Sequence, residues 1–290
     1  MNIKVTDVRV DPGDSAFLLD DGKTAILYDT GFGFTGFAVA EKIKKQLGDR
    51  DLDYIFLTHS HYDHALGSAY ILQVFPDAKV VASLHTAEVF KRPGAKKVMQ
   101  DLDAKHAAAC GITDYPFLGE HLRVDIVVQD GDVVQAGEYA FEVLSLPGHT
   151  HCSIGFYLRS EKLLLTCESL GVYDGKEQVL PSILVGCDLC LQSIDKVCAL
   201  DIKNLVAPHY GWLSEEQTRF YLTHCRQATE DMIELISQGI REEQTDEQIL
   251  AMLTEKYRHG HLESVYPKNA ANLNTGIMIR RIRKEKFGQE

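Results

Sequence analysis

Short apolar runs separated by polar turns fill the first third of the chain. Helical spacing of the apolar positions predicts helices near residues 37–47 and 65–75, and Pro76 ends the second. Residues 20–23 form a predicted hairpin turn between two strands. The strands expected in this part of the chain lie at residues 3–10, 15–19, 24–29, 54–57 and 79–83.

Strand-like and helical segments follow each other in the same way further along. Residues 96–110 are predicted to be helical, and residues 114–120 irregular. The next β-rich runs lie at residues 123–128, 133–136, 139–144, 153–158 and 162–165. Alternation of this kind indicates an α/β fold.

Beyond residue 213 the pattern is helical only. Residues 214–217 and 245–248 both fit capping boxes, and we expect Gly239 to separate the two helices that they start. A last helix is expected to include residues 269–282. These apolar stripes need another surface to cover them, so we expect a catalytic domain at 1–212 and a helical C-terminal extension at 213–290 that packs on it.

Composition and charge narrow the class of protein. The chain has 290 residues, of which 45% are hydrophobic and 25% charged, as in a soluble globular protein. Its first ten residues lack a long apolar core followed by small residues, so neither a signal peptide nor a membrane anchor is indicated and a cytoplasmic location is expected. The net charge of −12 opposes a nucleic-acid partner, and the basic run at 280–286 is interpreted as the solvated face of a terminal helix.

The seven cysteines are odd in number and dispersed, which favours reduced thiols over a disulfide framework. Cys187 and Cys190 form one C-x-x-C pair without a second pair to complete a zinc site. We interpret this pair as structural.

Residues 58–64, with the sequence THSHYDH, place three imidazoles and a carboxylate directly after an apolar strand. His59 and His61 are two residues apart, so their side chains point the same way only in an extended segment. Asp63 and His64 fall at the first turn of the following helix. Imidazole and carboxylate suit zinc, iron or manganese, so this junction is a predicted metal site that can face two ions.

Three more candidate ligands follow predicted strands. His149 lies in a Pro-Gly-His-Thr turn; His151 competes for the same role, but the tighter turn favours His149. Glu168 terminates the apolar run at residues 163–168, where a carboxylate can bridge two cations; the alternative is an exposed glutamate at the start of a loop. His209, in a Pro-His-Tyr-Gly segment, also follows an apolar run.

Together these motifs resemble the metallo-β-lactamase superfamily over residues 1 to about 212. The resemblance implies a four-layer αββα sandwich that carries a dinuclear site on loops at one edge of its two sheets. It further implies two sets of ligands around a bridging Glu168: His59, His61 and His149 for one metal, and Asp63, His64 and His209 for the other.

Two details qualify this resemblance. In the family the bridge is normally Asp after Gly, whereas here Glu168 follows Cys167, and the extra methylene leaves the identity and number of the metals open. Two divalent ions are expected, zinc first because of the five imidazoles, with iron or manganese as alternatives. Asp29, in an Asp-Thr-Gly turn, matches the residue that supports the metal-binding histidines in the family, although it also fits an ordinary turn aspartate.

The predicted function is hydrolysis of a small ester-like substrate, a thioester or carboxylic ester, by attack of a metal-bound hydroxide, with Asp63 taking part in proton transfer. The serines and cysteines form no evident triad with a dedicated base. A β-lactamase is a poor match, because it should be exported and this sequence indicates no export signal. A flavodiiron reductase is also a poor match, because it usually has an acid at the position of His61 and carries a flavin domain. A phosphodiesterase or nuclease with the same metals and a metal-binding effector with little turnover stay open as alternatives.

The helical extension resembles the C-terminal helices that cover the site in glyoxalase II-like thioesterases. Tyr173 and Tyr210 are candidates for orienting a substrate oxygen, and ordinary packing is the alternative for both. A small-molecule substrate and a homodimer through the helical tail are the expected partners. The sequence leaves the substrate, the native metal and the oligomeric state open.

Overall fold

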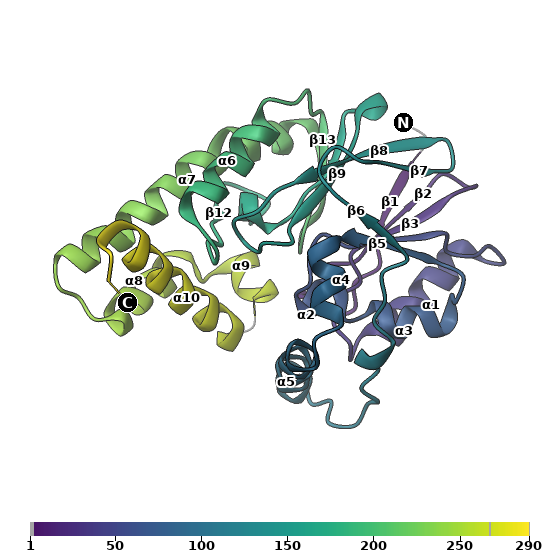
Figure 1. The fold of residues 1–290 in the computed structure, drawn as a ribbon, viewed down its shortest axis with the longest axis horizontal. Helices are drawn as coiled ribbons and strands as arrows, with labels where there is room; N and C mark the ends of the chain where they lie inside the picture. Colours follow the sequence, from purple (N-terminus) through teal and green to yellow (C-terminus); the bar gives the residue numbers. More distant parts are fainter. Residues whose placement is uncertain (1–2, 267, 290) are drawn as a thin grey trace. The chain divides into compact units, whose positions relative to one another are not determined.

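A computed structural model describes residues 3–266 and 268–289, with only the backbone described at Asn269 (Figure 1). Internal contacts divide the chain into two compact units. The first unit comprises Met1–Ser145 and Ile154–Glu161, and the second comprises Leu146–Ser153 and Lys162–Glu290. The domain boundary expected after residue 212 stays a prediction.

A six-stranded sheet forms the centre of the first unit. Its first three strands are antiparallel neighbours, and the pairings from the third strand onward are parallel. The strands in sheet order are β1 (Lys4–Asp7), β2 (Phe17–Asp20), β3 (Ala25–Tyr28), β4 (Tyr54–Phe56), β5 (Lys79–Ser83) and β6 (Ile126–Val128). All four residues of β3 are buried, which explains why its sequence is a continuous apolar run.

Five helices and a 3-10 turn accompany this sheet. Helix α1 buries Val39, Ala40, Ile43 and Leu47, the positions whose spacing predicted it, in the same core as the sheet. The elements are α1 (Gly36–Leu47), α2 (Tyr62–Ala65), α3 (Ser68–Val74), α4 (Leu84–Phe90), α5 (Pro93–Ala109) and η1 (Gly119–His121). Figure 1 shows α1 and α3 close together, consistent with their contacts.

The single helix expected at residues 65–75 is wrong in detail, because the chain forms α2 and α3 with a break at Gly67. A Cβ atom at Gly67 would lie 2.2 Å from the carbonyl oxygen of Thr30. The close approach lets the Gly67 N–H donate to the carbonyl of Gly31. The break is therefore a consequence of tertiary packing that helical periodicity does not report.

Three antiparallel strands complete the first unit with the short turn η2 (Arg159–Glu161). They are β7 (Val133–Ala136), β8 (Tyr139–Ser145) and β9 (Ile154–Leu158). Phe56 of β4 stacks on Phe156 of β9 with ring centroids 4.5 Å apart, and meets Phe141 of β8 edge-on at 5.3 Å. This aromatic cluster packs the hairpin of β8 and β9 against the six-stranded sheet.

The second unit combines short strands with helices. Strand β10 (Leu163–Leu165) pairs in parallel with β13 (Asn204–Ala207), which pairs antiparallel with β14 (Gly211–Leu213). A small ribbon, β11 (Val172–Tyr173) with β12 (Val179–Leu180), follows the turn η3 (Glu168–Leu170). Helix α6 (Cys187–Cys198), which the sequence analysis did not predict, buries both cysteines of the C-x-x-C pair in an apolar cluster.

Four helices form the C-terminal part: α7 (Glu215–Arg241), α8 (Asp246–Tyr257), α9 (Gly260–Val265) and α10 (Lys268–Phe287). Both predicted capping boxes are confirmed, at Ser214 with Gln217 and at Thr245 with Gln248. The expectation that Gly239 separates two helices is wrong, because it lies inside α7. A Cβ there would come within 2.8 Å of Ile249, so this glycine lets α8 approach α7 closely.

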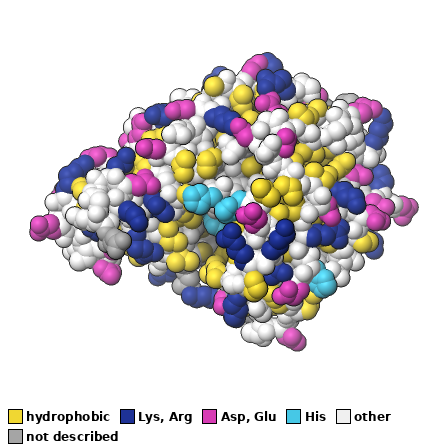
Figure 2. All heavy atoms as spheres, viewed as in Figure 1, with side chains coloured by type: hydrophobic (Ala, Val, Ile, Leu, Met, Phe, Trp, Pro, Cys, Tyr) yellow, Lys and Arg dark blue, Asp and Glu magenta, His cyan; other side chains and the backbone are white. Residues whose placement is uncertain are grey.

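None of the helices among residues 3–266 and 268–289 has both the length and the apolarity needed to span a bilayer. On the face drawn in Figure 2, acidic and basic side chains are interspersed with apolar and neutral ones.

Candidate metal centre

The histidine-rich segment of the first unit leaves the end of β4, and Asp29 leaves the end of the neighbouring parallel strand β3. Parallel strands end at the same edge of a sheet, so the two segments meet there. The Asp29 N–H donates to the carbonyl of Phe56 at 2.9 Å, and the Thr58 N–H donates to the Asp29 carboxylate at 2.9 Å. Asp29 is thereby held directly beneath the segment that carries the imidazoles.

The Asp29 carboxylate also fixes His64. It lies 2.8 Å from His64 Nδ1 and accepts a hydrogen bond from the Ser15 hydroxyl at 3.0 Å, and all of these side chains are buried. In a neutral ring, an acceptor at Nδ1 selects the tautomer with its proton on Nδ1 and its lone pair on Nε2. This is the arrangement that a metal-binding imidazole needs.

Three imidazole rings gather in this segment. The ring centroid of His59 lies 4.6 Å from that of His61 and 4.1 Å from that of His64. The backbone at His61 is extended and α2 begins at Tyr62, so Asp63 and His64 lie on the first helical turn as predicted. His64 Nε2 is 3.9 Å from a carboxylate oxygen of Asp63.

In the second unit, the candidate ligands lie around the carboxylate of Glu168, which is buried in η3 just after β10. One of its oxygens lies 2.9 Å from His149 Nε2, and the other lies 3.5 Å from His209 Nε2. Both imidazoles are buried, whereas His151, the alternative to His149, is exposed. The three candidate ligands of this unit are therefore neighbours despite their distance in sequence.

The contact between His149 and Glu168 indicates whether these residues suit a bound cation. His149 Nδ1 lies 3.1 Å from the carbonyl oxygen of Ser182, which can only accept, so Nδ1 carries a proton. In a neutral ring Nε2 then holds a lone pair that faces the carboxylate of Glu168 at 2.9 Å. Two acceptors at this distance need a proton or a shared cation to hold them together, and a divalent metal fits that requirement.

Tyr266 is a site residue that the sequence analysis missed. Its buried hydroxyl donates a hydrogen bond to the Glu168 oxygen that faces His209, and its ring lies 5.5 Å from the His209 ring. Tyr266 follows α9 in the helical extension, far from every motif that indicated metal chemistry. No pattern in its own segment distinguishes it from a packing tyrosine.

Tyr173 and Tyr210, the residues predicted to orient substrate, pack against each other with ring centroids 5.6 Å apart. The Tyr173 hydroxyl donates to the carbonyl of Lys176, and burial raises the pKa of Tyr173 to about 12. The Tyr210 hydroxyl accepts from the Gln217 amide at 3.0 Å. Their visible contacts are those of packing residues, and a role in substrate binding stays a prediction.

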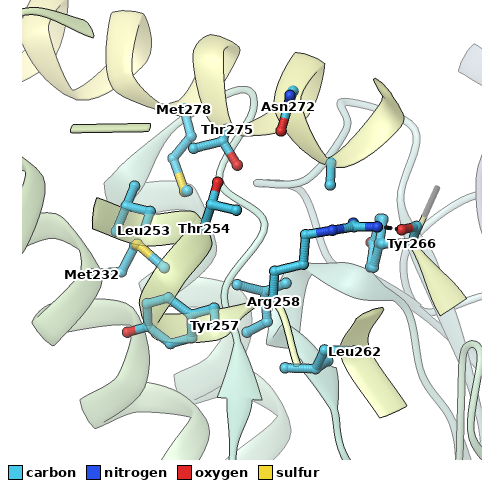
Figure 3. Close-up of a pocket in the computed structure, with 12 residues that line it drawn as sticks. Met232, Leu253, Thr254, Tyr257, Arg258, Leu262, Tyr266, Asn272, Thr275 and Met278 are labelled. Atoms are coloured by element: carbon cyan, nitrogen blue, oxygen red, sulfur yellow. Dashed lines mark hydrogen bonds between the residues drawn. The ribbon is translucent and has the colours of Figure 1, made fainter. Parts of the chain in front are cut away.

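A small apolar pocket adjoins Tyr266 within the C-terminal helices (Figure 3). Its volume is about 40 Å³. Arg258 lines it and donates to the backbone carbonyl of Tyr266 at 2.8 Å. The other lining residues include Met232, Leu253, Tyr257, Leu262 and Met278. Tyr266 thus connects the carboxylate of Glu168 with an apolar cavity.

The sequence profile described as the Metallo-beta-lactamase superfamily matches residues 11–209, more than half of the chain. The chain belongs to the metallo-beta-lactamase superfamily. In this superfamily member, the clustered imidazoles and carboxylates described above are donors suited to divalent metal ions.

Several curated relatives of this superfamily member are named as hydrolases or thioesterases. Hydroxyacylglutathione hydrolase GloC of Haemophilus influenzae is 26% identical over 172 residues, which cover 59% of this chain and 72% of that protein. Acyl-coenzyme A thioesterase MBLAC2 of Gallus gallus is 26% identical over 166 residues, 55% of this chain and 57% of the relative. The probable hydroxyacylglutathione hydrolase glo2 of Schizosaccharomyces pombe is 32% identical over 122 residues, and the chain spans only 33% of its length. The prediction that this chain is a metal-dependent hydrolase of the superfamily is confirmed, and its substrate stays a prediction.

Solved structures agree on the fold. A metallo-beta-lactamase family protein from Thermus thermophilus matches with a TM-score of 0.63 at 19% identity, covering 96% of this chain and 93% of that one. An archaeal superfamily protein from Sulfolobus tokodaii gives a TM-score of 0.59 at 19% identity, with 95% and 94% covered. The predicted α/β metallo-β-lactamase fold with a helical C-terminal region is confirmed.

Proposed function

We propose that this chain is a dinuclear metallohydrolase that cleaves a small thioester, with a carboxylic ester as the nearest alternative bond. Two ligand sets would hold the ions of the proposed centre: His59, His61 and His149 for one ion, and Asp63, His64 and His209 for the other. Glu168 would be shared by both. Zinc is the proposed metal because imidazoles dominate this donor set.

One observation carries the proposal: the buried carboxylate of Glu168 faces the acceptor nitrogen of His149 at 2.9 Å and lies 3.5 Å from a ring nitrogen of His209. A buried carboxylate is costly unless a cation or a proton compensates its charge. In the first unit, the His64 lone pair is set on Nε2 by Asp29, which prepares that ring for the same role.

Bound divalent ions would supply Lewis acidity toward the scissile carbonyl and lower the pKa of water near neutrality. The protein's own groups complete the chemistry. Asp63, part-exposed beside His64, is placed to accept a proton during attack and return it to the leaving group. Tyr266 holds one oxygen of Glu168 and so fixes the direction of the proposed bridge.

Two observations support the thioester. Relatives that are 26% identical to this chain over 172 and 166 aligned residues are named for hydroxyacylglutathione hydrolysis and acyl-coenzyme A thioesterase activity. The apolar pocket beside Tyr266, at about 40 Å³, accommodates a short apolar group rather than a long chain. We infer an acyl group of a few carbons.

Metal analysis combined with a substrate panel tests the proposed function. The purified full chain is analysed for zinc, iron and manganese, and then assayed with short-chain and long-chain thioesters, carboxylic esters and bis-p-nitrophenyl phosphate. We expect two zinc ions per chain and fastest turnover of a short-chain thioester. Preference for the phosphodiester would replace the proposal with a phosphodiesterase, and full metal content without any turnover would indicate a metal-binding effector.

The substitution His61→Ala is expected to remove metal and reduce activity to background, because it deletes a proposed ligand from a part-exposed position. Cys187→Ser is the control: Cys187 is buried in the core of the second unit, so we expect unchanged metal content and unchanged kcat. Circular dichroism of both variants verifies folding. Full activity and full metal content in folded His61→Ala protein would contradict the ligand assignment.

A further inference from the structure

A second group of metal-binding side chains lies in the first unit, away from the histidine-rich segment. It consists of Asp11, from the loop between β1 and β2, with His106 and Cys110 at the end of α5. His106 and Cys110 are four residues apart and therefore share one face of the helix end. None of these three residues belongs to the proposed dinuclear centre.

The donor atoms of this group converge. His106 Nε2 lies 3.2 Å from one Asp11 oxygen, Cys110 Sγ lies 3.5 Å from the other, and the sulfur lies 3.9 Å from Nε2. A tetrahedral zinc ion with bonds of about 2.0 Å to nitrogen and oxygen and about 2.3 Å to sulfur sets its ligands roughly 3.3–3.6 Å apart. The three atoms already stand at nearly these separations.

The surroundings orient the imidazole toward the group. The His106 ring packs against Phe32 and Phe34, with centroids 4.7 Å and 5.5 Å apart. Its Nδ1 is buried and has no hydrogen-bond partner among the described residues, so Nε2 is the ring nitrogen with polar neighbours. The backbone N–H of Gly13 donates to Asp11 at 2.8 Å and holds the carboxylate in place.

A protein nucleophile explains this geometry less well. In a nucleophile pair the imidazole would use one nitrogen toward the thiol and the other toward an orienting acid. Here the acid and the thiol both face Nε2, and Nδ1 faces neither. Three donors converging on one point is the arrangement of a metal site.

Charge also favours a dication. Asp11 and a Cys110 thiolate together carry two negative charges, which one divalent ion neutralises. Without a cation, partial burial and the nearby Asp11 raise the pKa of Cys110 above its usual value and keep the thiol protonated. Metal binding would exchange the thiol proton for a metal–sulfur bond and release that proton to solvent.

We propose that Asp11, His106 and Cys110 form an additional binding site for a zinc-like divalent ion, with solvent as the fourth ligand. Cys110 is exposed and the side chains of Asp11 and His106 are 16% and 13% exposed, so an ion can reach the group from the surface. The ion would tie the end of α5 to the loop after β1.

Cobalt(II) titration of the full chain, stripped with a chelator, tests this site. The proposed dinuclear centre contains no sulfur ligand, so a thiolate-to-cobalt charge-transfer band in the near ultraviolet reports only on the additional site. We expect the band to appear with one equivalent of bound cobalt. Cys110→Ser should abolish it and lower the bound metal by one equivalent.

Cys198→Ser is the matched control, because Cys198 is the other cysteine that is exposed in the structure. It should retain the band and the full metal content. His61→Ala should also retain the band while losing metal from the dinuclear centre, which separates failure of this inference from failure of the proposed function. An unchanged band in Cys110→Ser, or a folded wild-type protein without a band at excess cobalt, would overturn the additional site.

Discussion

The two sets of proposed ligands are built in different ways. In the first unit, four donors lie within residues 59–64, and Asp29 supports them from the neighbouring strand. In the second unit, His149, Glu168 and His209 come from three separate segments, and a carboxylate stands at their centre. The first set is thus organised by local backbone geometry, and the second by one buried charge.

Both sets nevertheless use a strained residue at the end of a strand. Asp29 follows β3 with φ of 51°, and His209 follows β13 with φ of 60°. This left-handed conformation is uncommon for residues other than glycine and persists only where surrounding contacts stabilise it. Asp29 is held by hydrogen bonds with Thr58 and His64, and His209 lies against Glu168 and Tyr266. Because the carboxylate of Glu168 lies near both imidazoles of the second unit, we expect the second set to depend strongly on that single side chain.

Removing the central carboxylate gives the largest expected effect. Glu168→Ala deletes the group that both imidazoles of the second unit face. A metal centre supplies several kcal/mol of transition-state stabilisation, so we expect its loss to lower kcat/KM by roughly a thousandfold. Elemental analysis should show loss of at least one ion per chain. Glu168→Asp is the control, because it keeps the charge and shortens the side chain by one bond; we expect it to retain metal and partial activity. Near wild-type activity in Glu168→Ala would show that the carboxylate is not the bridge.

Weakening the support of the first set gives a smaller effect. Asp29→Asn keeps the shape of the side chain and tolerates the left-handed backbone, but it removes the charge that holds the proton on His64 Nδ1. We expect metal affinity to fall by about 10–100-fold, as for other partners of metal-binding histidines. Competition with a chromophoric chelator measures the change. Ser15→Ala, which removes one hydrogen bond to Asp29 without altering its charge, should change the affinity less, and equal losses in both variants would contradict a specific role for the carboxylate.

The same contrast explains how far the sequence could predict this molecule. The first ligand set is contiguous, so the spacing of His59 and His61 and the helix at Asp63 could be predicted from local rules. Capping boxes also identified the starts of α7 and α8. Tyr266 carries no local signal, because its role arises only when the helical extension reaches Glu168. The unbroken helix across Gly67 and the helix boundary at Gly239 were wrong for a related reason. The close contacts that need these glycines are made by other segments, with Thr30 at Gly67 and Ile249 at Gly239.

The smallest effect is expected from the hydroxyl of Tyr266. Tyr266→Phe keeps the ring that lines the apolar pocket and removes only the hydrogen bond to Glu168. A hydrogen bond to a charged group is worth about 1.5 kcal/mol or more, so we expect kcat to fall about tenfold while metal content stays unchanged. Tyr257→Phe is the matched control, because Tyr257 lines the same pocket and has no described contact with Glu168. Equal kcat values in the two variants would assign Tyr266 to packing, whereas a loss confined to Tyr266→Phe would show that the helical extension positions the bridging carboxylate.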